Sequence, residues 1–143
     1  MNTATSNATP AQLTLLDAMK DPVIFGPWFE SKTWRAWRVF FRALFGLKMG
    51  PRSLEIYPKH TGRTVPPEQP SKEAWLVVGR RGGKSRCAAL VAVFLACFRV
   101  YRPLLAPGER GTVMVIAADR KQARVIFRYI VGFLEAVPLL GRW

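Results

Sequence analysis

The sequence predicts an α/β fold built on a parallel βαβ unit and preceded by an aromatic-rich helical segment. An apolar run, Ala74–Val78, leads into a glycine-rich loop, Gly79–Gly83, and then into a helical pattern from Lys84 to about Tyr101. A second apolar run, Thr112–Ala118, follows a break that contains Pro and Gly. Strand, helix and strand in this order predict two parallel strands joined by a right-handed crossover. With 143 residues, half of them hydrophobic, the chain is long enough to bury a core.

Three regions follow one another along the chain. We expect residues 1–10 to form a disordered start, because Thr, Ser, Asn and Ala dominate there. Residues 11–70 comprise a helical front segment and a connector, and residues 71–143 carry the βαβ unit. No basic and then apolar leader is visible at the N-terminus, so the chain does not resemble a secretory precursor.

The front segment contains two helical patterns and an irregular connector. A weak pattern around Leu13–Met19 ends at Asp21 and Pro22. Ser31 can cap a helix that continues to about Phe45, with its aromatic side chains near one face. The connector, residues 51–70, is rich in Pro and Gly, which predicts one helical turn near residues 54–57 and otherwise no regular structure.

Two further helices belong to the second half of the chain. The pattern that starts at Lys84 is apolar nearly all round, so we expect other elements to cover this helix on more than one side. A last helix starts after Asp119, which can cap it, and Pro138 stops it. Cys87 and Cys97 have no metal-binding partners nearby, and we interpret both as small core residues in a reducing compartment.

The net charge limits the partners that the chain can have. The formal charge is +13, from 22 Lys and Arg against 9 Asp and Glu. Such an excess favours a polyanion, either nucleic acid or an anionic membrane surface. The apolar stretch from Cys87 to Phe98 is shorter than the ~20 residues that a membrane-spanning helix needs. A soluble protein with no membrane partner is therefore expected.

The loop in GRRGGKS has the composition of a phosphate-binding loop. Gly82 and Gly83 allow the backbone to approach an anion, and a helix that begins at Lys84 and Ser85 favours negative charge at its N-terminus. In the G-x-x-x-x-G-K-[ST] pattern, the lysine reaches the β/γ-phosphates and the hydroxyl binds Mg²⁺. Val78 stands where the pattern has its first glycine. The alternative is an ordinary turn between strand and helix, for which two adjacent arginines would be unnecessary.

The remaining motifs have a functional and a structural interpretation. Asp119 ends an apolar run as a Walker B acid does, but Arg120 follows it where a Glu could activate water, so we interpret Asp119 as a helix cap. Arg120, Arg124 and Arg128 share one helical face and either follow DNA phosphates or form a solvated basic face. Tryptophans that could stack on a base or belong to the core are Trp28, Trp34 and Trp37. His60 receives no role.

Four stretches together resemble the N-terminal part of the large terminase subunit of tailed phages. These stretches are WFESKTWRAWRVFFRALFGLKM, EIYxKxTGRT, WLVVGRRGGKSR and VIAADRKQARVIF, and the similarity extends from about Pro22 to Leu140. The family is an ATP-driven DNA-packaging motor, which implies a P-loop NTPase fold, ATP and Mg²⁺ as cofactors, and a host-cell cytoplasmic location. It also implies double-stranded DNA, the small terminase subunit, the portal ring and further copies of the large subunit as partners.

The resemblance also implies roles for individual residues. Lys84 and Arg80 would be the catalytic residues: Lys84 would bind the phosphates, and Arg80 would sense or stabilise the γ-phosphate. The Ser85 hydroxyl would bind Mg²⁺. The residues expected to bind the nucleotide are Gly79, Arg80, Arg81, Gly82, Gly83, Lys84, Ser85 and Arg86, with the purine near Trp28 or Trp34. The Walker B acidic pair and the nuclease residues of the family would lie beyond residue 143.

The sequence is therefore expected to be a fragment that binds ATP, hydrolyses it at background rates, and self-associates or dissolves poorly. The alternatives are a non-enzymatic basic DNA-binding module and a fragment of a P-loop helicase.

Overall fold

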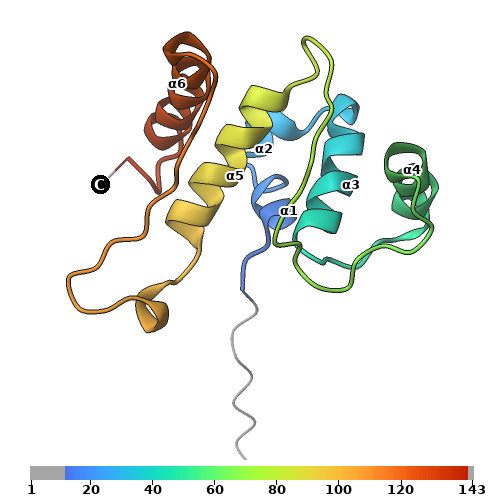
Figure 1. The fold of residues 1–143 in the computed structure, drawn as a ribbon, viewed down its shortest axis with the longest axis horizontal. Coiled ribbons are helices and arrows are strands. Elements are labelled where there is room, and N and C mark those ends of the chain that lie inside the picture. The colour runs from blue at the N-terminus through green and yellow to red at the C-terminus, as the bar shows by residue number, and fades with distance from the viewer. Residues whose placement is uncertain (1–11, 142–143) are drawn as a thin grey trace, which may run out of the picture.

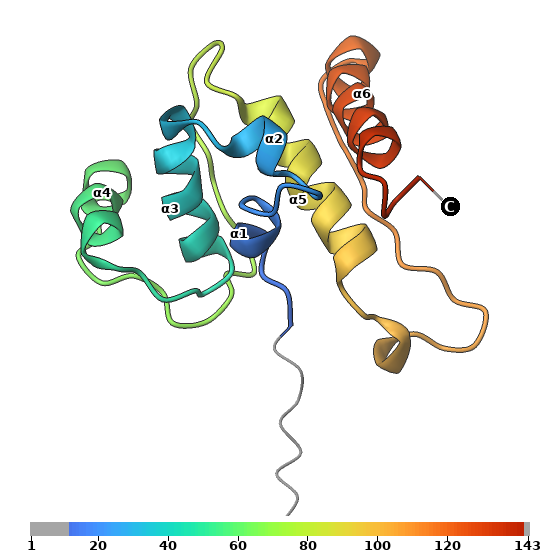
Figure 2. The ribbon, with the colours of Figure 1, turned by 180° about the vertical axis from the view of Figure 1, so that it is seen from behind.

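The protein consists of helices joined by extended segments, as seen in a computed structural model that describes residues 12–141. Along the chain lie α1 (Leu15–Ala18), α2 (Gly26–Phe29), η1 (Lys32–Trp34), α3 (Arg35–Leu44), α4 (Pro51–Thr61), α5 (Lys84–Phe98), η2 (Arg102–Leu104) and α6 (Arg120–Ala136). Helix α5 lies between α6 on one side and the group α1 to α3 on the other, and α4 packs outside α3 (Figures 1 and 2). The expected disordered start, residues 1–10, lies outside the described residues.

The prediction of an α/β fold with a βαβ P-loop unit is wrong. Residues 12–141 contain no β-strand, and both apolar runs that we expected to pair, 74–78 and 112–118, are irregular. The first runs between α3 and α5, whereas the second runs beside α6 (Figures 1 and 2). Their backbones therefore do not form a hydrogen-bonded ladder with each other.

High β-propensity was insufficient because neither run has a partner strand. A strand is stable only when neighbouring strands take up its backbone hydrogen bonds and one of its faces is covered. Instead, Trp75 is 88% exposed, Val77 is fully exposed and Ile116 is 82% exposed. Water can form hydrogen bonds with the backbone N–H and C=O groups of such open segments, so these groups do not require a partner strand.

Side-chain caps start three of the helical segments. Thr14 and Asp17 form a capping box at α1, in which the Asp17 N–H donates to Thr14 Oγ1 at 3.1 Å. The hydrogen bond from the Thr14 side chain is the main cause of the lowered pKa of Asp17. Ser31 accepts from the Thr33 N–H before η1, and Asp119 accepts from the Gln122 N–H at 2.8 Å before α6. The interpretation of Asp119 as a cap is confirmed, whereas Ser31 caps only the short 3-10 helix η1, and α3 follows from Arg35 without a side-chain cap of its own.

The connector is more ordered than the sequence suggested. Instead of one turn near residues 54–57, helix α4 runs through Pro51–Thr61. Pro51 stands in the first turn, where its missing N–H costs nothing, and Gly62 ends the helix with a left-handed φ of 68°. Pro51 thus starts a helix at the first residue of the segment that was expected to be an irregular connector.

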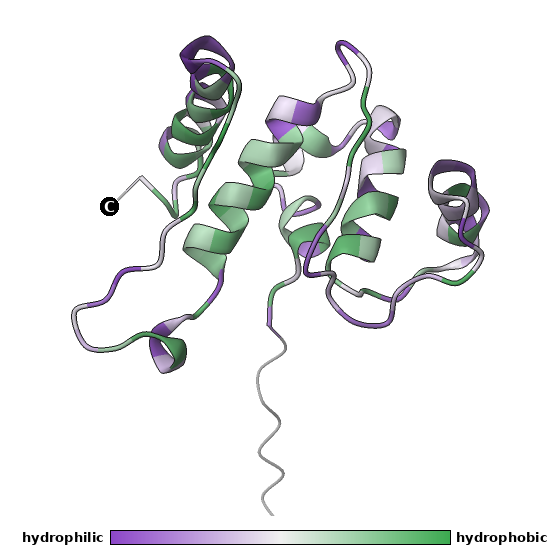
Figure 3. Ribbon diagram, viewed as in Figure 1, coloured by the Kyte–Doolittle hydropathy of each residue, from purple (hydrophilic) through white to green (hydrophobic). Residues whose placement is uncertain are grey.

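Aromatic side chains of α5 and of the elements on either side of it form the core. The Phe133 ring of α6 lies 5.5 Å from Phe25 and 5.9 Å from Phe29, and Phe94 of α5 lies 5.8 Å from Phe45. Figure 3 shows that hydrophobic residues extend along most of α5, as its sequence pattern predicted. Each aromatic ring buried in this way contributes about 1.5–3 kcal/mol, so the core depends on α2, α5 and α6 together.

The two cysteines have different environments. Cys87 is buried in α5, where burial raises the pKa of its thiol to about 12, so the thiol is protonated at neutral pH. Cys97 is exposed, which corrects the expectation that both cysteines are core residues. Both are free thiols.

A backbone contact joins the two ends of the segment that carries α4. The Ser71 N–H donates to the carbonyl of Leu44, the last residue of α3, at 2.8 Å. Gly46 has a φ of 62°, and a Cβ there would collide with the backbone of Gln69 and Pro70. The chain therefore leaves and rejoins the rest of the molecule at one point.

In the part of the chain that the structure describes, no helix is long and apolar enough to cross a membrane.

Candidate phosphate-binding site

The glycine loop ends in a helix start that has no side-chain cap. Gly83 is the N-cap of α5 with φ 81°, and its carbonyl accepts the first helical hydrogen bond, from the Cys87 N–H at 3.0 Å. Within residues 12–141, the N–H groups of Lys84, Ser85 and Arg86 have no hydrogen-bond acceptor. Unpaired N–H groups and the positive end of the helix dipole together favour an anion at this position.

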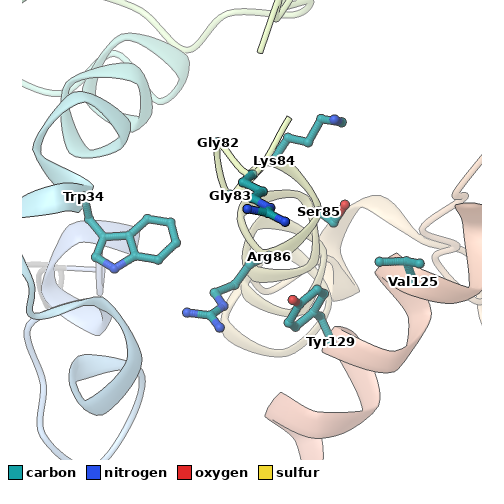
Figure 4. A pocket seen from close by; sticks show the side chains of 9 residues that line it. Trp34, Gly82, Gly83, Lys84, Ser85, Arg86, Val125 and Tyr129 are labelled. Atoms are coloured by element: carbon teal, nitrogen blue, oxygen red, sulfur yellow. The ribbon is translucent and has the colours of Figure 1, made fainter. Parts of the chain in front are cut away.

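This helix start opens into a pocket of about 370 Å³ between the front segment and α6 (Figure 4). Trp34 of η1 stands on one side, and Val125 and Tyr129 of α6 stand on the other. The complete lining is Trp34, Arg81, Gly82, Gly83, Lys84, Ser85, Arg86, Val125 and Tyr129. The site thus depends on the packing of η1 and α6 beside the N-terminus of α5.

The pocket is positively charged. Three of its lining residues, Arg81, Lys84 and Arg86, carry cationic side chains, and none carries a carboxylate. Lys84 and Arg81 are exposed, so they can reach a ligand without losing an existing partner. The combined charge of three cations and a helix N-terminus suits a group with several negative charges, such as a polyphosphate.

Arg86 lies between two aromatic rings. Its guanidinium carbon is 5.6 Å from the centre of the Trp34 ring and 5.5 Å from that of Tyr129. Figure 4 shows Trp34 and Tyr129 on opposite sides of the Arg86 side chain. Cation–π attraction at these distances holds the guanidinium in place while leaving its N–H donors available.

The structure brings together only part of the site expected from the sequence. Arg81 to Arg86 and Trp34 line one pocket, whereas Gly79 and Arg80 do not line it. Gly79 instead borders a separate groove between α3 and α4. Trp28 packs into the core, 5.7 Å from Phe133, and does not line the phosphate pocket.

Two residues of the pocket were not predicted. Val125 and Tyr129 lie four residues apart on α6, a spacing that puts them on one helical face. That spacing is visible in the sequence. The sequence does not show that this face meets the start of α5, because that depends on how α6 packs against α5.

The remaining predicted residues lie on the surface of α6. Arg120, Arg124 and Arg128 are all exposed, and Arg124 and Arg128 border a shallow groove that also contains Phe127. Across residues 12–141, no cluster of His, Cys, Asp and Glu could by itself hold a metal ion. A Mg²⁺ ion at Ser85 would therefore take its other ligands from the phosphates and from water.

Comparison with protein-family models, with curated proteins and with solved structures finds no match to this chain.

Proposed function

We propose that this protein binds the polyphosphate of ATP, together with Mg²⁺, in the pocket at the N-terminus of α5. The observation that carries the proposal is the uncapped helix start that opens among Arg81, Lys84 and Arg86. Gly83 takes the left-handed φ from which α5 starts, and the backbone N–H groups that follow it are left unpaired for a phosphate. The cationic side chains complement the negative charge of a polyphosphate, and the N–H groups can donate hydrogen bonds to its oxygen atoms.

The lining residues have separate roles in this proposal. The N–H groups of Lys84 to Arg86 and the Lys84 ammonium bind phosphate oxygens, and the Ser85 hydroxyl is a ligand of Mg²⁺. The base would lie toward Trp34, which lines one side of the pocket. Arg80 keeps its predicted role in phosphate chemistry only if the exposed loop brings its side chain to the ligand.

The resemblance of the quoted stretches to large terminase subunits supports a wider role. In this role the chain is the ATP-binding part of a DNA-packaging motor that works in the cytoplasm of a bacterial host. Its partners are double-stranded DNA, the small terminase subunit, the portal ring and further copies of the large subunit. Hydrolysis by this chain alone stays near background, because Asp119 serves as the α6 cap and no acid that could activate water lines the pocket.

Titration calorimetry with Mg-ATP tests the proposal. Lys84→Ala should weaken binding about tenfold or more, because a hydrogen bond to a charged group is lost. Lys59→Ala is the matched control, since Lys59 is an exposed lysine near the end of α4 and does not line the pocket. Absence of binding by the unaltered protein, or equal binding by Lys84→Ala, would contradict the proposal. Rapid ATP turnover that Lys84→Ala abolishes would contradict the low hydrolysis rate.

A second candidate function is binding of the DNA backbone by α6. The exposure of Arg120, Arg124 and Arg128 on one helix favours it, and the formal charge of +13 supports it. DNA affinity should then fall steeply with salt concentration and fall further in a triple Ala variant of these arginines. Competition separates the two functions, because Mg-ATP would displace DNA only if the DNA phosphates occupied the pocket at α5.

A further inference from the structure

The strongest additional feature is a pair of tryptophans that hold the glycine loop from outside. The Trp37 indole N–H on α3 donates to the Gly82 carbonyl at 2.8 Å, across 45 residues of sequence. A trans peptide points its C=O and N–H in opposite directions. Because the Gly82 carbonyl faces Trp37, the Gly83 N–H of the same peptide faces away from α3.

Trp34 contacts the next residue of the loop. An ideal Cβ built on Gly83 would lie 2.8 Å from Cζ3 of Trp34, so the ring fills the space where a side chain would stand. The same ring faces the Arg86 guanidinium at 5.6 Å. Trp34 therefore supports both the backbone at the helix start and one of the cations of the pocket.

The Trp37 ring is itself fixed by the core. It meets Phe40 nearly at right angles with 5.7 Å between ring centres, and it lies 6.1 Å from Phe41, which is fully buried. Aromatic packing of this kind leaves the indole little freedom to turn. The carbonyl of Gly82 is thus attached to a rigid part of the molecule.

The loop has little to hold it otherwise. Its internal backbone hydrogen bond, from the Gly82 N–H to the Gly79 carbonyl, is long at 3.3 Å. Arg81 and Gly83 both have positive φ angles, of 61° and 81°, and Arg81 pays the steric cost of this conformation. A loop that is strained and exposed needs an outside support to keep its N–H groups ready for a ligand.

We propose that Trp37 is a positioning residue for the phosphate site, with Trp34 as its partner on the following residue. This inference rests on the proposed function, because it concerns how tightly the pocket binds a polyphosphate. Trp37 does not line the pocket. It acts through the Gly82 peptide, which it holds in the orientation that the ligand needs.

The test replaces only the indole N–H. Trp37→Phe keeps an aromatic ring against Phe40 and Phe41 but cannot donate to Gly82. Affinity for Mg-ATP and for inorganic pyrophosphate should fall about threefold to tenfold, the effect of one hydrogen bond. Trp75→Phe is the matched control, because the exposed Trp75 donates its indole N–H to Glu73 at 2.8 Å, outside the pocket.

Hydrogen exchange without ligand separates this inference from the proposed function. The Cys87 amide bonds to the Gly83 carbonyl, so its exchange reports the order of the helix start. Trp37→Phe should speed this exchange severalfold, and Trp75→Phe should not. Unchanged exchange or unchanged affinity would overturn the positioning role. If the unaltered protein binds neither ligand, the proposed function falls while the exchange result still decides the role of Trp37.

Discussion

Gly83 combines two requirements that only glycine meets. Its φ of 81° lies in the left-handed region, and the Trp34 ring occupies the space that a Cβ would need. The residue also separates the loop from α5, so a change there alters the direction in which the helix starts. Its role is geometric, because it gives the backbone a left-handed turn and leaves space for the Trp34 ring.

Gly83→Ala should destabilise the fold by at least about 1–2 kcal/mol, the cost of a left-handed alanine, because displacement of Trp34 adds to that cost. Phosphate affinity should fall as well. Gly132→Ala is the control: Gly132 lies inside α6 with no atom near its Cβ position, and alanine should stabilise the helix there by about 0.5–1 kcal/mol. Urea denaturation measures both variants. Equal stability of Gly83→Ala and the unaltered protein would contradict the described contact with Trp34.

At the residue scale, the sequence predicts the local part of the site and misses the rest. Gly82 to Ser85 were found because glycine, lysine and serine at a helix start have chemical consequences that need no knowledge of the fold. Tyr129 was missed, because it enters the pocket only after α6 has packed against α5. The tryptophans illustrate the same limit, since Trp34 lines the pocket and Trp28 joins the core, although both are partly buried.

At the scale of the element, start and stop signals predicted helices better than apolar runs predicted strands. Caps such as Ser31 and Asp119 act on their immediate neighbours, so they operate in any surroundings. The runs at 74–78 and 112–118 have strand composition, but a strand also needs another strand beside it. Their sequences contain no information on whether such a strand is within reach.

Phe133 is the buried residue of helix α6. Phe133→Ala should destabilise the protein by about 3–5 kcal/mol, because its ring contacts Phe25, Trp28 and Phe29 and its removal leaves a cavity. Phe127→Ala, on the same helix, should change stability by no more than about 0.5 kcal/mol, since Phe127 is 60% exposed. Thermal unfolding followed by circular dichroism distinguishes the two. A similar small effect for both would show that α6 does not pack on the core through Phe133.

Considered as a whole, the molecule exposes an unusual amount of apolar side chain along its two extended segments. Large apolar residues at least 70% exposed include Trp75, Val77, Met114 and Ile116. Exposed apolar surface of this kind promotes contacts between molecules. The net charge of +13 opposes such contacts at low salt and opposes them less as salt screens it.

We therefore expect self-association that strengthens as salt concentration rises. Val77→Lys combined with Ile116→Lys should shift the protein toward monomer in sedimentation velocity experiments, because it removes apolar surface and adds charge. Leu139→Lys is the control, since Leu139 is a 61% exposed apolar residue outside both segments. A monodisperse monomer at all salt concentrations would contradict this expectation.

The contact between Leu44 and Ser71 has a consequence for how the chain could vary. Residues 47–68, with α4 among them, begin and end at almost the same place, where Gly46 passes close to Gln69. They carry part of a small core of their own, in which Met49 and Tyr57 meet Val39 of α3. Such a segment can be shortened, lengthened or exchanged for another without moving the ends that it joins. Helix α4 packs outside α3 and shares no residue with the lining of the phosphate pocket, so variation in this segment leaves that lining unchanged.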